Sequence, residues 1–440
     1  MNTPICSFLK KYASDDNLRL HMPGHKGLGQ VEKYDLTEID GADSLYEASG
    51  IILESEENAS RLFGSYTLYS TEGSSLAIRA MLYLSMLRRH EDGRPVILAG
   101  RNAHKVFVSA AALLDFDIEW LCGTSSYLSC NITPEDVEKR ILEMSRRPLA
   151  VYITSPDYLG NVADIKGISE VCKRLGVLLL VDNAHGAYLA FTTPNMHPIS
   201  LGADMCADSA HKTLPCLTGA AYLHLADNIS DSIRQRAKSA LALFGSTSPS
   251  YLILASLDKA NSYLSNGYRE KLLGLTEKLK QLKSKLCEAG YEILGNEPMK
   301  LTVLPKSYGY TGYQIADVLK KNMIVPEFSD PDHIVLMITP EITDSELERV
   351  VDLLTSLPKK EKIIASTPTL SLPMRKMSPR EAILKEAERI NVRESLGRVL
   401  ADITVGCPPA VPIVVSGEII NEDAIRAFEY YGIDTCSVLK

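Results

Sequence analysis

Long apolar runs are absent from this sequence. None of its 440 residues lies in a stretch of the roughly 18 consecutive apolar residues that a membrane-spanning helix needs. The first residues, MNTPICSFLKKYASDD, also lack the basic and then apolar layout of a secretory signal peptide. We therefore expect a cytoplasmic protein with no membrane partner.

Paired cysteines and an excess of positive charge are missing as well. The nine cysteines are scattered without a C-x-x-C pair, so neither a metal site nor a disulfide framework is expected. The formal net charge is −8, which argues against the concentrated basic surface that nucleic-acid binding requires. No internal repeat or low-complexity tract is visible. The remaining composition, 45% hydrophobic and 23% charged, is that of a soluble globular protein.

Short apolar runs alternate with amphipathic stretches between residues 60 and 225. The runs lie at residues 95–99, 118–121, 149–154 and 177–182. Helical patterns follow Ser75 and Ala103 and cover residues 134–144 and 165–174. Apolar strands joined by helices predict an α/β fold with a mostly parallel sheet covered on both faces. Such sheets bind ligands beyond the carboxyl ends of their strands.

The chain changes character beyond residue 250. A run of leucines spaced three and four residues apart predicts a long helix with a core-facing stripe rather than a coiled coil. These residues are Leu272, Leu275, Leu279, Leu282 and Leu286. Thr343 and Glu346 have the spacing of a capping box within a smaller α+β region. Prolines and lysines that follow this α+β region predict a linker.

These patterns predict three domains. The first is an N-terminal arm with a large ligand-binding domain over residues 1–260. The second is a small α+β domain over residues 261–357, and a linker follows at 358–373. The third is a compact C-terminal domain over residues 374–440.

The strand VLLLVD, which leads into NAHGAY, carries the strongest local signal. Asp182 would lie at the carboxyl end of a buried strand, where it could hold a pyridine nitrogen protonated, cap a loop or bind a metal. After a second expected strand at 203–208 comes SAHKT, in which Lys212 is flanked by Ser209, His211 and Thr213. Such a polar site can lower the pKa of a lysine nucleophile. Together the two segments predict a pyridoxal-phosphate enzyme that carries its cofactor on Lys212.

Two further segments could complete this site. YSTEGSSLAIRAML (69–82) is a glycine-serine turn running into a helix, where backbone N–H groups and the hydroxyls of Ser74 and Ser75 could bind a phosphate. It fits neither a Walker motif nor G-x-G-x-x-G. RNAHKVF (101–107) would place His104 at the same sheet edge as Asp182. That histidine could stack on the cofactor ring or cap the following helix.

The sequence resembles the group III (prokaryotic-type) ornithine/lysine/arginine decarboxylases of pyridoxal-phosphate fold type I. The matching segments include HMPGHKG (21–27), RNAHK (101–105), VDNAHGAY (181–188), SAHKTL (209–214), STSPSYLILASLD (246–258), EFSD (327–330) and PPAVPIVVSGE (408–418). The resemblance implies decarboxylation of lysine, ornithine or arginine to CO₂ and a polyamine-type amine. HMPGHKG begins at residue 21, so the wing domain of the large members, and a decamer built from it, are not expected.

The resemblance also implies roles for single residues. Lys212 looks like the Schiff-base lysine, Asp182 like the partner of the pyridinium nitrogen and His104 like the ring-stacking histidine. Ala184 and His185 would lie by the opposite ring face. The phosphate would be held by Ser74, Ser75, Ser209 and His211. Thr247 and Ser248 resemble the segment that reaches the phosphate of a neighbouring subunit, which implies a homodimer with its active site at the subunit interface.

The substrate pocket is where the sequence departs from the family pattern. TEGSS replaces a more common Asn-Gly-Ser/Thr form, LTG (217–219) replaces Thr-Gln, and CPPAVPIVVSGE differs from Tyr-Pro-Pro-Gly-Ile-Pro. A basic substrate side chain needs a carboxylate, for which Asp43, Glu47 and Glu418 are the candidates, unless they are ordinary solvated acids.

Two other functions share Asp182 and Lys212. An aminotransferase or β-lyase would need an arginine for the substrate carboxylate, and Arg375, Arg380 and Arg398 are the late arginines available. A catalytically inactive regulatory subunit with the same fold is the other alternative.

Overall fold

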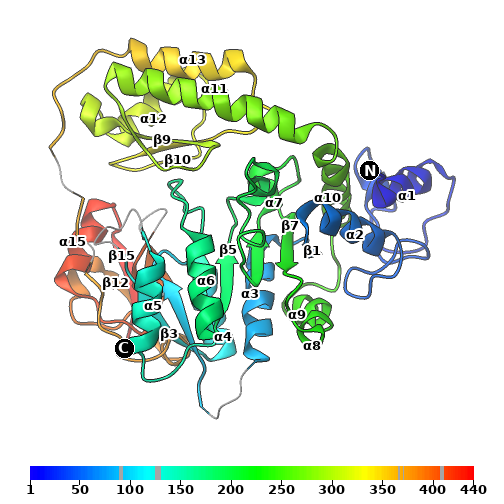
Figure 1. Cartoon of the computed structure of the whole chain (residues 1–440), viewed down its shortest axis with the longest axis horizontal. Helices are drawn as coiled ribbons and strands as arrows, with labels where there is room; N and C mark the ends of the chain where they lie inside the picture. The colour runs from blue at the N-terminus through cyan, green and yellow to red at the C-terminus, as the bar shows by residue number, and fades with distance from the viewer. Residues whose placement is uncertain (89–92, 124–129, 365–366, 370, 407–410) are drawn as a thin grey trace. The chain divides into compact units, whose positions relative to one another are not determined.

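The computed structural model describes residues 1–88, 93–123, 130–364, 367–369, 371–406 and 411–440. The chain divides into two compact units, and most of their helices and strands are labelled in Figure 1. Unit 1 contains Met1–Glu91 and Cys172–Glu270, and unit 2 contains Asp92–Val171 and Lys271–Lys440.

The strands of unit 1 lie in the order β1-β7-β6-β5. They are β1 (Tyr66–Ser70), β5 (Leu178–Asp182), β6 (Met205–Asp208) and β7 (Ala221–Leu225). β5 and β6 run parallel, whereas β7 is antiparallel to both β6 and β1. The residues of β5, β6 and β7 are all buried, which explains why they form nearly unbroken apolar runs. The antiparallel pair β1–β7 is an element that the sequence patterns did not single out.

Helices of unit 1 cover these strands. α3 (Gly73–Met86) packs across β1, β5, β6 and β7, and α9 (Ala237–Phe244) packs on α3. Three more helices pack on one another near the N-terminus: α1 (Pro4–Ser14), α2 (Ile51–Phe63) and α10 (Tyr251–Leu264). The shorter helices are α7 (Ala210–Thr213) and α8 (Asp231–Arg234).

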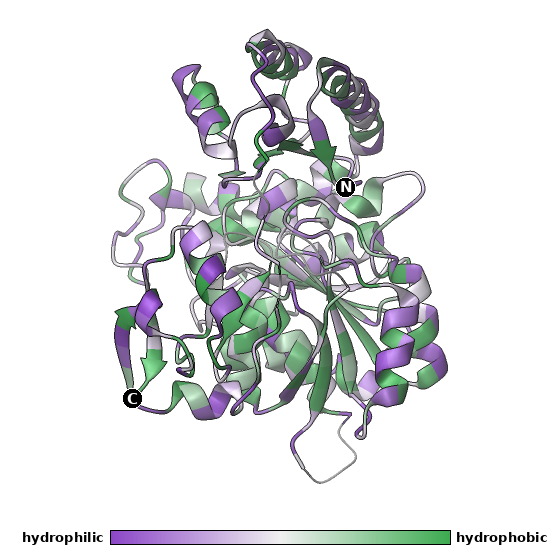
Figure 2. Cartoon of the chain, turned by 90° about the vertical axis from the view of Figure 1, so that its left-hand side faces the viewer, coloured by the Kyte–Doolittle hydropathy of each residue, from purple (hydrophilic) through white to green (hydrophobic). Residues whose placement is uncertain are grey.

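Unit 2 contains the parallel strands β4-β2-β3. Their bounds are β2 (Val96–Gly100), β3 (Asp117–Leu121) and β4 (Ala150–Thr154). The helices of this region are α4 (Lys105–Leu114), α5 (Pro134–Glu143) and α6 (Ile165–Leu175). Thr133 caps α5 through its side chain, with Pro134 as the first helical residue, so this expected boundary is confirmed. The parallel strands are mostly green in Figure 2, in keeping with their burial.

A four-stranded antiparallel sheet follows in the order β10-β11-β9-β8. Its strands are β8 (Glu292–Leu294), β9 (Lys300–Leu304), β10 (Phe328–Ser329) and β11 (Ile334–Met337). The helices of this region are α11 (Tyr268–Ala289), α12 (Gly312–Lys321) and α13 (Asp344–Ser356). All five leucines of the predicted stripe on α11 are buried, which confirms a core-facing stripe. Thr343 and Glu346 form the predicted capping box of α13.

The last part of unit 2 has two small sheets, β12–β15 and β13–β14. The elements are α14 (Pro379–Ile383), β12 (Ala387–Asn391), β13 (Thr404–Gly406), β14 (Pro412–Val415), α15 (Glu422–Tyr430) and β15 (Thr435–Leu439). Their apolar side chains form a core of their own, centred on Leu400, Ile413, Ile420 and Phe428, each completely buried. Residues 408–410 of the PPAVPIVVSGE segment lie outside the described residues.

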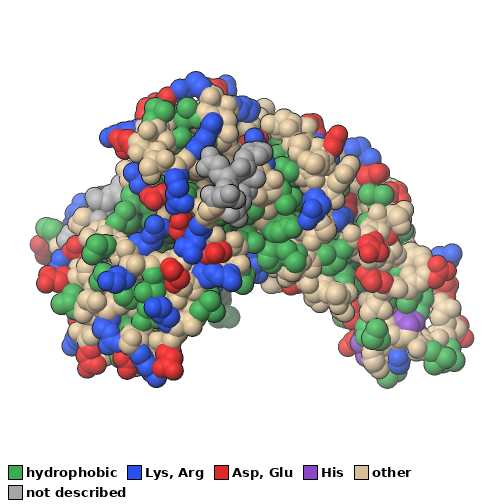
Figure 3. Space-filling view, turned by 90° about the horizontal axis from the view of Figure 1, so that it is seen from below, with side chains coloured by type: hydrophobic (Ala, Val, Ile, Leu, Met, Phe, Trp, Pro, Cys, Tyr) green, Lys and Arg blue, Asp and Glu red, His purple; other side chains and the backbone are tan. Residues whose placement is uncertain are grey.

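Acidic and basic side chains are interspersed on the face shown in Figure 3, as the mixed charge of the composition suggests. Among the described helices, none combines the length and the apolarity that crossing a membrane requires. The parallel strands with helical connections confirm the predicted α/β class.

Candidate active site

The ends of β5 and β6 lie beside each other in unit 1. Asp182 stands opposite Ala207 in the parallel register. β5 ends at Asp182, while β6 ends at Asp208 and leads through Ser209 into α7. Because parallel strands present their carboxyl ends at one edge, Asp182 at the end of β5 and the α7 segment with Lys212 emerge together.

Lys212 and His185 meet at this edge. The Nζ atom of Lys212 lies 3.1 Å from Nε2 of His185, which is buried, and Lys212 itself is half-buried. Asp182 is only 2% exposed, and its Oδ1 accepts a hydrogen bond of 3.1 Å from the N–H of Ala184. A lysine amine on α7, an imidazole just after β5 and a buried carboxylate at the end of β5 therefore lie at one edge of the sheet.

The glycine-serine turn lies against the same segment. The hydroxyl oxygens of Ser74 and Ser209 are 2.7 Å apart, at the N-terminus of α3. The N–H of Gly73 donates to the carbonyl of Gly219 at 2.7 Å, and a Cβ on Gly219 would come within 2.8 Å of the carbonyl of Thr71. This close backbone approach requires glycine. Helix N–H groups and two hydroxyls thus form a donor set suited to a phosphate.

The other expected phosphate ligands are less buried than the Ser74–Ser209 hydroxyl pair. Ser75 is half-buried in the first turn of α3. Nδ1 of His211 pairs with the carbonyl of Ala220 at 2.9 Å, which leaves Nε2 as its second polar atom. Thr247 and Ser248 are exposed. Their neighbour Ser246 donates its N–H to Oε1 of Glu72 in the TEGSS turn at 2.6 Å.

His104 belongs to unit 2. It is exposed and forms the N-cap of α4, because its Nδ1 accepts a hydrogen bond of 3.3 Å from the N–H of Val106. The helix-capping interpretation therefore describes its local contacts, and its role beside a cofactor ring stays a prediction. The three late arginines of unit 2 are hydrogen-bonded to backbone carbonyls: Arg375 to Ile118, Arg380 to Ala112 and Arg398 to Leu439.

Asp43 organises a loop. Its carboxylate accepts hydrogen bonds from the N–H groups of Ser44, Ser49, Gly50 and Ile52 at 2.8–3.0 Å. Burial alone would raise the pKa of this carboxyl, but the four N–H donors outweigh burial and lower it. Glu47, in the same loop, is exposed.

Glu418 forms a buried ion pair with Arg101. Its two oxygens lie 2.6 and 2.8 Å from the two terminal guanidinium nitrogens, and it accepts the N–H of Val415 at 2.9 Å. The side chains of Arg101 and Glu418 are 0% and 3% exposed. The guanidinium also lies over the Trp120 ring at 4.8 Å. This carboxylate anchors the C-terminal region to the end of β2 within unit 2.

Four residues at the site were not singled out from the sequence: Asn183, His197, Asp208 and His224. They form a buried polar cluster around the carboxylate of Asp208. The position of Asp208, directly before SAHKT at the end of an expected strand, was the available signal. The two histidines come from segments with no motif, so only the fold brings them there.

Replacing Arg101 with leucine should lower the free energy of unfolding by about 3–5 kcal/mol, because Glu418 would be left as an unpaired buried charge. Urea unfolding measures this. Arg393→Leu is the control, since Arg393 and Glu429 form an exposed pair with side chains 77% and 44% exposed. The control should change stability by less than about 0.5 kcal/mol. Equal losses in the two variants would contradict the anchoring role.

The Asp43→Asn variant tests the loop carboxylate. A lowered pKa in the folded state means that ionised Asp43 stabilises the protein above its ordinary pKa of about 3.9, and that this stabilisation is lost as the pH falls through the lower folded value. The variant should thus be less stable than wild type near neutral pH, and the difference should shrink in acid. Unfolding curves at several pH values measure it, with exposed Asp40→Asn as the control. A difference that is independent of pH would be inconsistent with this account.

The chain matches two domain models of one protein family. The model described as Orn/Lys/Arg decarboxylase, major domain, matches residues 3–294, and the model of the C-terminal domain matches residues 359–434. The arginine decarboxylase of Bacillus subtilis (strain 168) is 31% identical over 460 residues, covering 96% of this chain and 92% of the relative. The arginine decarboxylase of Halalkalibacterium halodurans is also 31% identical, covering 96% of this chain and 91% of the relative.

Solved structures show the same fold. The lysine decarboxylase of Francisella novicida has a TM-score of 0.82 at 19% identity, covering 100% of this chain and 81% of its own. The constitutive lysine decarboxylase of E. coli has a TM-score of 0.81 at 19% identity, covering 100% and 82%. At these identities the likeness concerns the fold, which is confirmed as pyridoxal-phosphate-dependent transferase fold type I. With family matches along most of its length, this chain belongs to the Orn/Lys/Arg decarboxylase family.

Proposed function

We propose that this protein uses pyridoxal phosphate, carried on Lys212, to decarboxylate a basic amino acid. The observation that carries the proposal is the contact of 3.1 Å between Lys212 Nζ and His185 Nε2, on the edge where Asp182 ends β5. The overall reaction takes up one proton, because the bond from Cα to the carboxylate is replaced by a bond from Cα to hydrogen. Its products are CO₂ and the corresponding amine.

The residues present fit this cofactor. The N-terminus of α3 with the hydroxyls of Ser74 and Ser209 provides donors for a phosphate, and the backbone approach at Gly219 keeps that turn compact. Asp182 is a buried carboxylate suited to a protonated ring nitrogen. When bound, pyridoxal phosphate supplies an electron sink for the pair left on Cα when CO₂ departs.

The protein's own groups then orient the substrate and move protons. The amine of Lys212 would bind the cofactor, and the same side chain could supply the proton that Cα takes up. Asp182 would hold the ring nitrogen in its protonated form. His104, whose Nδ1 accepts a hydrogen bond from the N–H of Val106, would stack on the cofactor as the family resemblance implies. Ser75, Ala184 and His211 would complete the cofactor contacts.

Arginine is the first substrate to test. The two relatives that are 31% identical along nearly the whole chain are arginine decarboxylases, whereas the lysine decarboxylases are similar in fold. Of the three carboxylates considered for the basic end of the substrate, Glu47 has the most accessible side chain. The carboxylate of Asp43 already accepts hydrogen bonds from backbone N–H groups, and that of Glu418 is already paired with Arg101.

The test is a panel of assays with arginine, lysine and ornithine, measuring both CO₂ and amine. Wild-type protein with added cofactor should show an absorbance band at roughly 420 nm and release CO₂ from at least one substrate. Lys212→Ala should lose the band and at least about a thousandfold in turnover, because the covalent attachment and its proton are both removed. Exposed Lys259→Ala is the control and should behave as wild type.

Two results would overturn this function. Unchanged turnover in Lys212→Ala would exclude the proposed role of the lysine. A keto acid in place of CO₂ and amine would identify an aminotransferase, which shares Asp182 and Lys212.

We further infer that the protein acts as a cytoplasmic homodimer, with Thr247 and Ser248 reaching the phosphate of the second subunit. The exposure of these two residues supports this, as do the large apolar side chains exposed between residues 18 and 31. These are Leu18, Leu20, Met22, Leu28 and Val31. Covering such side chains with a second copy would remove their apolar surface from water.

The domain boundaries at 260, 357 and 374 also stay a proposal, supported by the separate family match to residues 359–434.

The dimer is tested by the double variant Leu18→Glu, Leu20→Glu, in which both replaced side chains are 83% exposed. Wild type should sediment as a dimer and the variant mainly as a monomer, because the charges would have to be buried in the interface. Turnover should fall with the dimer fraction. Leu142→Glu, at a position 67% exposed on α5, is the control and should stay dimeric. A monomeric wild type with full activity would contradict the dimer.

A further inference from the structure

The carboxylate of Asp208 is buried in unit 1, one residue before the segment that carries Ser209 and Lys212. Asp208 is the last residue of β6 and is completely buried. Its Oδ2 lies 3.0 Å from Nε2 of His197 and 3.2 Å from Nε2 of His224. Its Oδ1 accepts hydrogen bonds from Nδ2 of Asn183 at 2.7 Å and from the thiol of Cys206 at 3.3 Å. Four donors from separate places in the sequence therefore converge on one carboxylate.

The surroundings keep Asp208 ionised and its partners in place. Burial opposes the charged form, but the electrostatic interactions with the His197 and His224 rings, together with their hydrogen bonds, hold the pKa of the Asp208 carboxyl well below its usual range. Burial also lowers the pKa of His224, which favours its neutral ring. The Phe63 ring packs on both imidazoles, with centroids 5.7 and 4.7 Å away. A buried anion with four donors is strongly oriented, since each hydrogen bond to a charged group is directional.

The cluster also has the residue types of a cation site, but its hydrogen bonds favour a different role. The N–H of Ile199 points at Nδ1 of His197, at 3.4 Å. Because Nδ1 accepts this bond, Nε2 is the ring nitrogen that can donate, and it faces Oδ2 of Asp208. A metal ligand would need a lone pair at that atom. The arrangement is therefore that of a hydrogen-bonded anchor.

The anchor joins both loops of the site. Asn183, held by Asp208, follows Asp182 directly and precedes His185 by two residues. Asp208 itself is followed by Ser209, which contacts Ser74 and is the N-cap of α7, the short helix that contains Lys212. The contact between Lys212 and His185 thus has one partner on each loop, and one carboxylate holds both loops.

We propose that Asp208 is a positioning residue that sets the Lys212–His185 contact and the place of Asp182 by clamping the β5 and β6 loops together. The proposal rests on the proposed cofactor chemistry and adds a residue that touches neither substrate nor cofactor. Removing the clamp should loosen the cofactor site before any substrate is present.

The test compares Asp208→Asn with Asp204→Asn, a matched change just before the start of the same strand. Asp204 is 8% exposed and accepts hydrogen bonds from the N–H of Leu179 and from Nδ2 of Asn228 at 2.8 and 3.1 Å. Apoprotein of each variant is titrated with pyridoxal phosphate in the absence of substrate. The absorbance and induced circular dichroism of the bound cofactor are recorded, because the dichroism reports how the ring is held.

Asp208→Asn should bind the cofactor about tenfold or more weakly and with altered dichroism, because its amide would turn a donor toward the Nε2–H of His197. Asp204→Asn should lower the melting temperature but keep wild-type affinity and dichroism. Where Asp208→Asn does not fold, Asn183→Ser decides, since it frees only the β5 loop and should weaken binding severalfold.

The positioning role would be overturned if folded Asp208→Asn bound the cofactor with the affinity and dichroism of wild type. If only Asn183→Ser folds, the same result for that variant would overturn it. Equal weakening by Asp204→Asn would also overturn it, since the effect would then be general destabilisation. Failure of wild-type protein to bind pyridoxal phosphate would instead contradict the proposed function on which the inference rests. Failure of the positioning role and failure of the proposed function are distinguishable, because the proposed function is tested on wild-type protein alone.

Discussion

The parallel pairing of β5 with β6 is the constraint on which the rest of the site depends. With Asp182 opposite Ala207, both strands end at one edge, and the chain leaves each strand through a short loop. The carboxylate of Asp182 ends β5, the imidazole of His185 follows it along the chain, and Lys212 lies in α7 just after β6. A shift of one residue in this register would turn Asp182 to the opposite face of the sheet, because side chains alternate along a strand.

Buried charges recur where loops must be held, and each is surrounded by donors or a partner. In unit 1, Asp208 takes four hydrogen bonds and ties together segments that are up to 41 residues apart, from Asn183 to His224. In unit 2, Glu418 takes two hydrogen bonds from Arg101 and one from Val415. Burying a charge is costly unless it is paired. These positions therefore accept few replacements, and they are expected to fix geometry more than to add stability.

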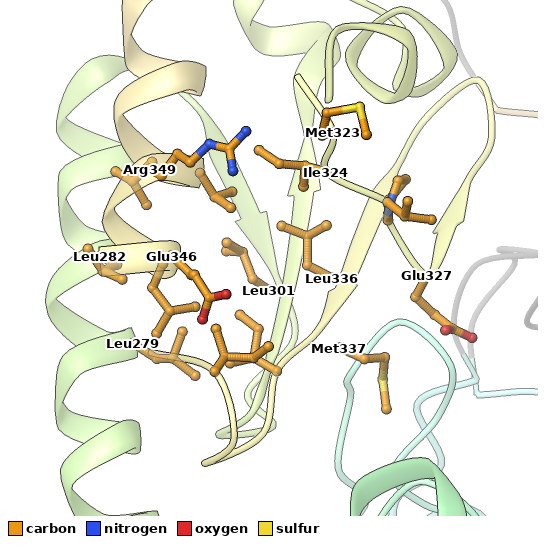
Figure 4. A pocket seen from close by; sticks show the side chains of 17 residues that line it. Leu279, Leu282, Leu301, Met323, Ile324, Glu327, Leu336, Met337, Glu346 and Arg349 are labelled. Carbon is orange, nitrogen blue, oxygen red and sulfur yellow. The ribbon is translucent and has the colours of Figure 1, made fainter. Parts of the chain in front are cut away.

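Outside the site, the small antiparallel sheet carries an apolar pocket of its own. Leu279 and Leu282 of α11, Leu301 and Leu336 of the sheet and Val351 of α13 line it, with a volume of about 440 Å³ (Figure 4). Arg349 lies at this pocket and hydrogen-bonds to the carbonyl of Asn322. The pocket shows how the leucine stripe on α11 is used, since two of its residues face the sheet across this space.

The sequence by itself determined the α/β class, the strands that end at Asp182 and Asp208, the capping box of Thr343 and Glu346 and the family, because hydrophobic periodicity and ordered motifs are local properties of the chain. It also singled out Lys212 and Asp182. Only the tertiary structure decided that Glu418 pairs with Arg101, since 317 residues separate them. The same holds for the pairing of β1 with β7 and for the convergence of His197 and His224 on Asp208. Contacts between distant segments depend on how strands and helices pack. No local sequence pattern around these residues encodes that packing.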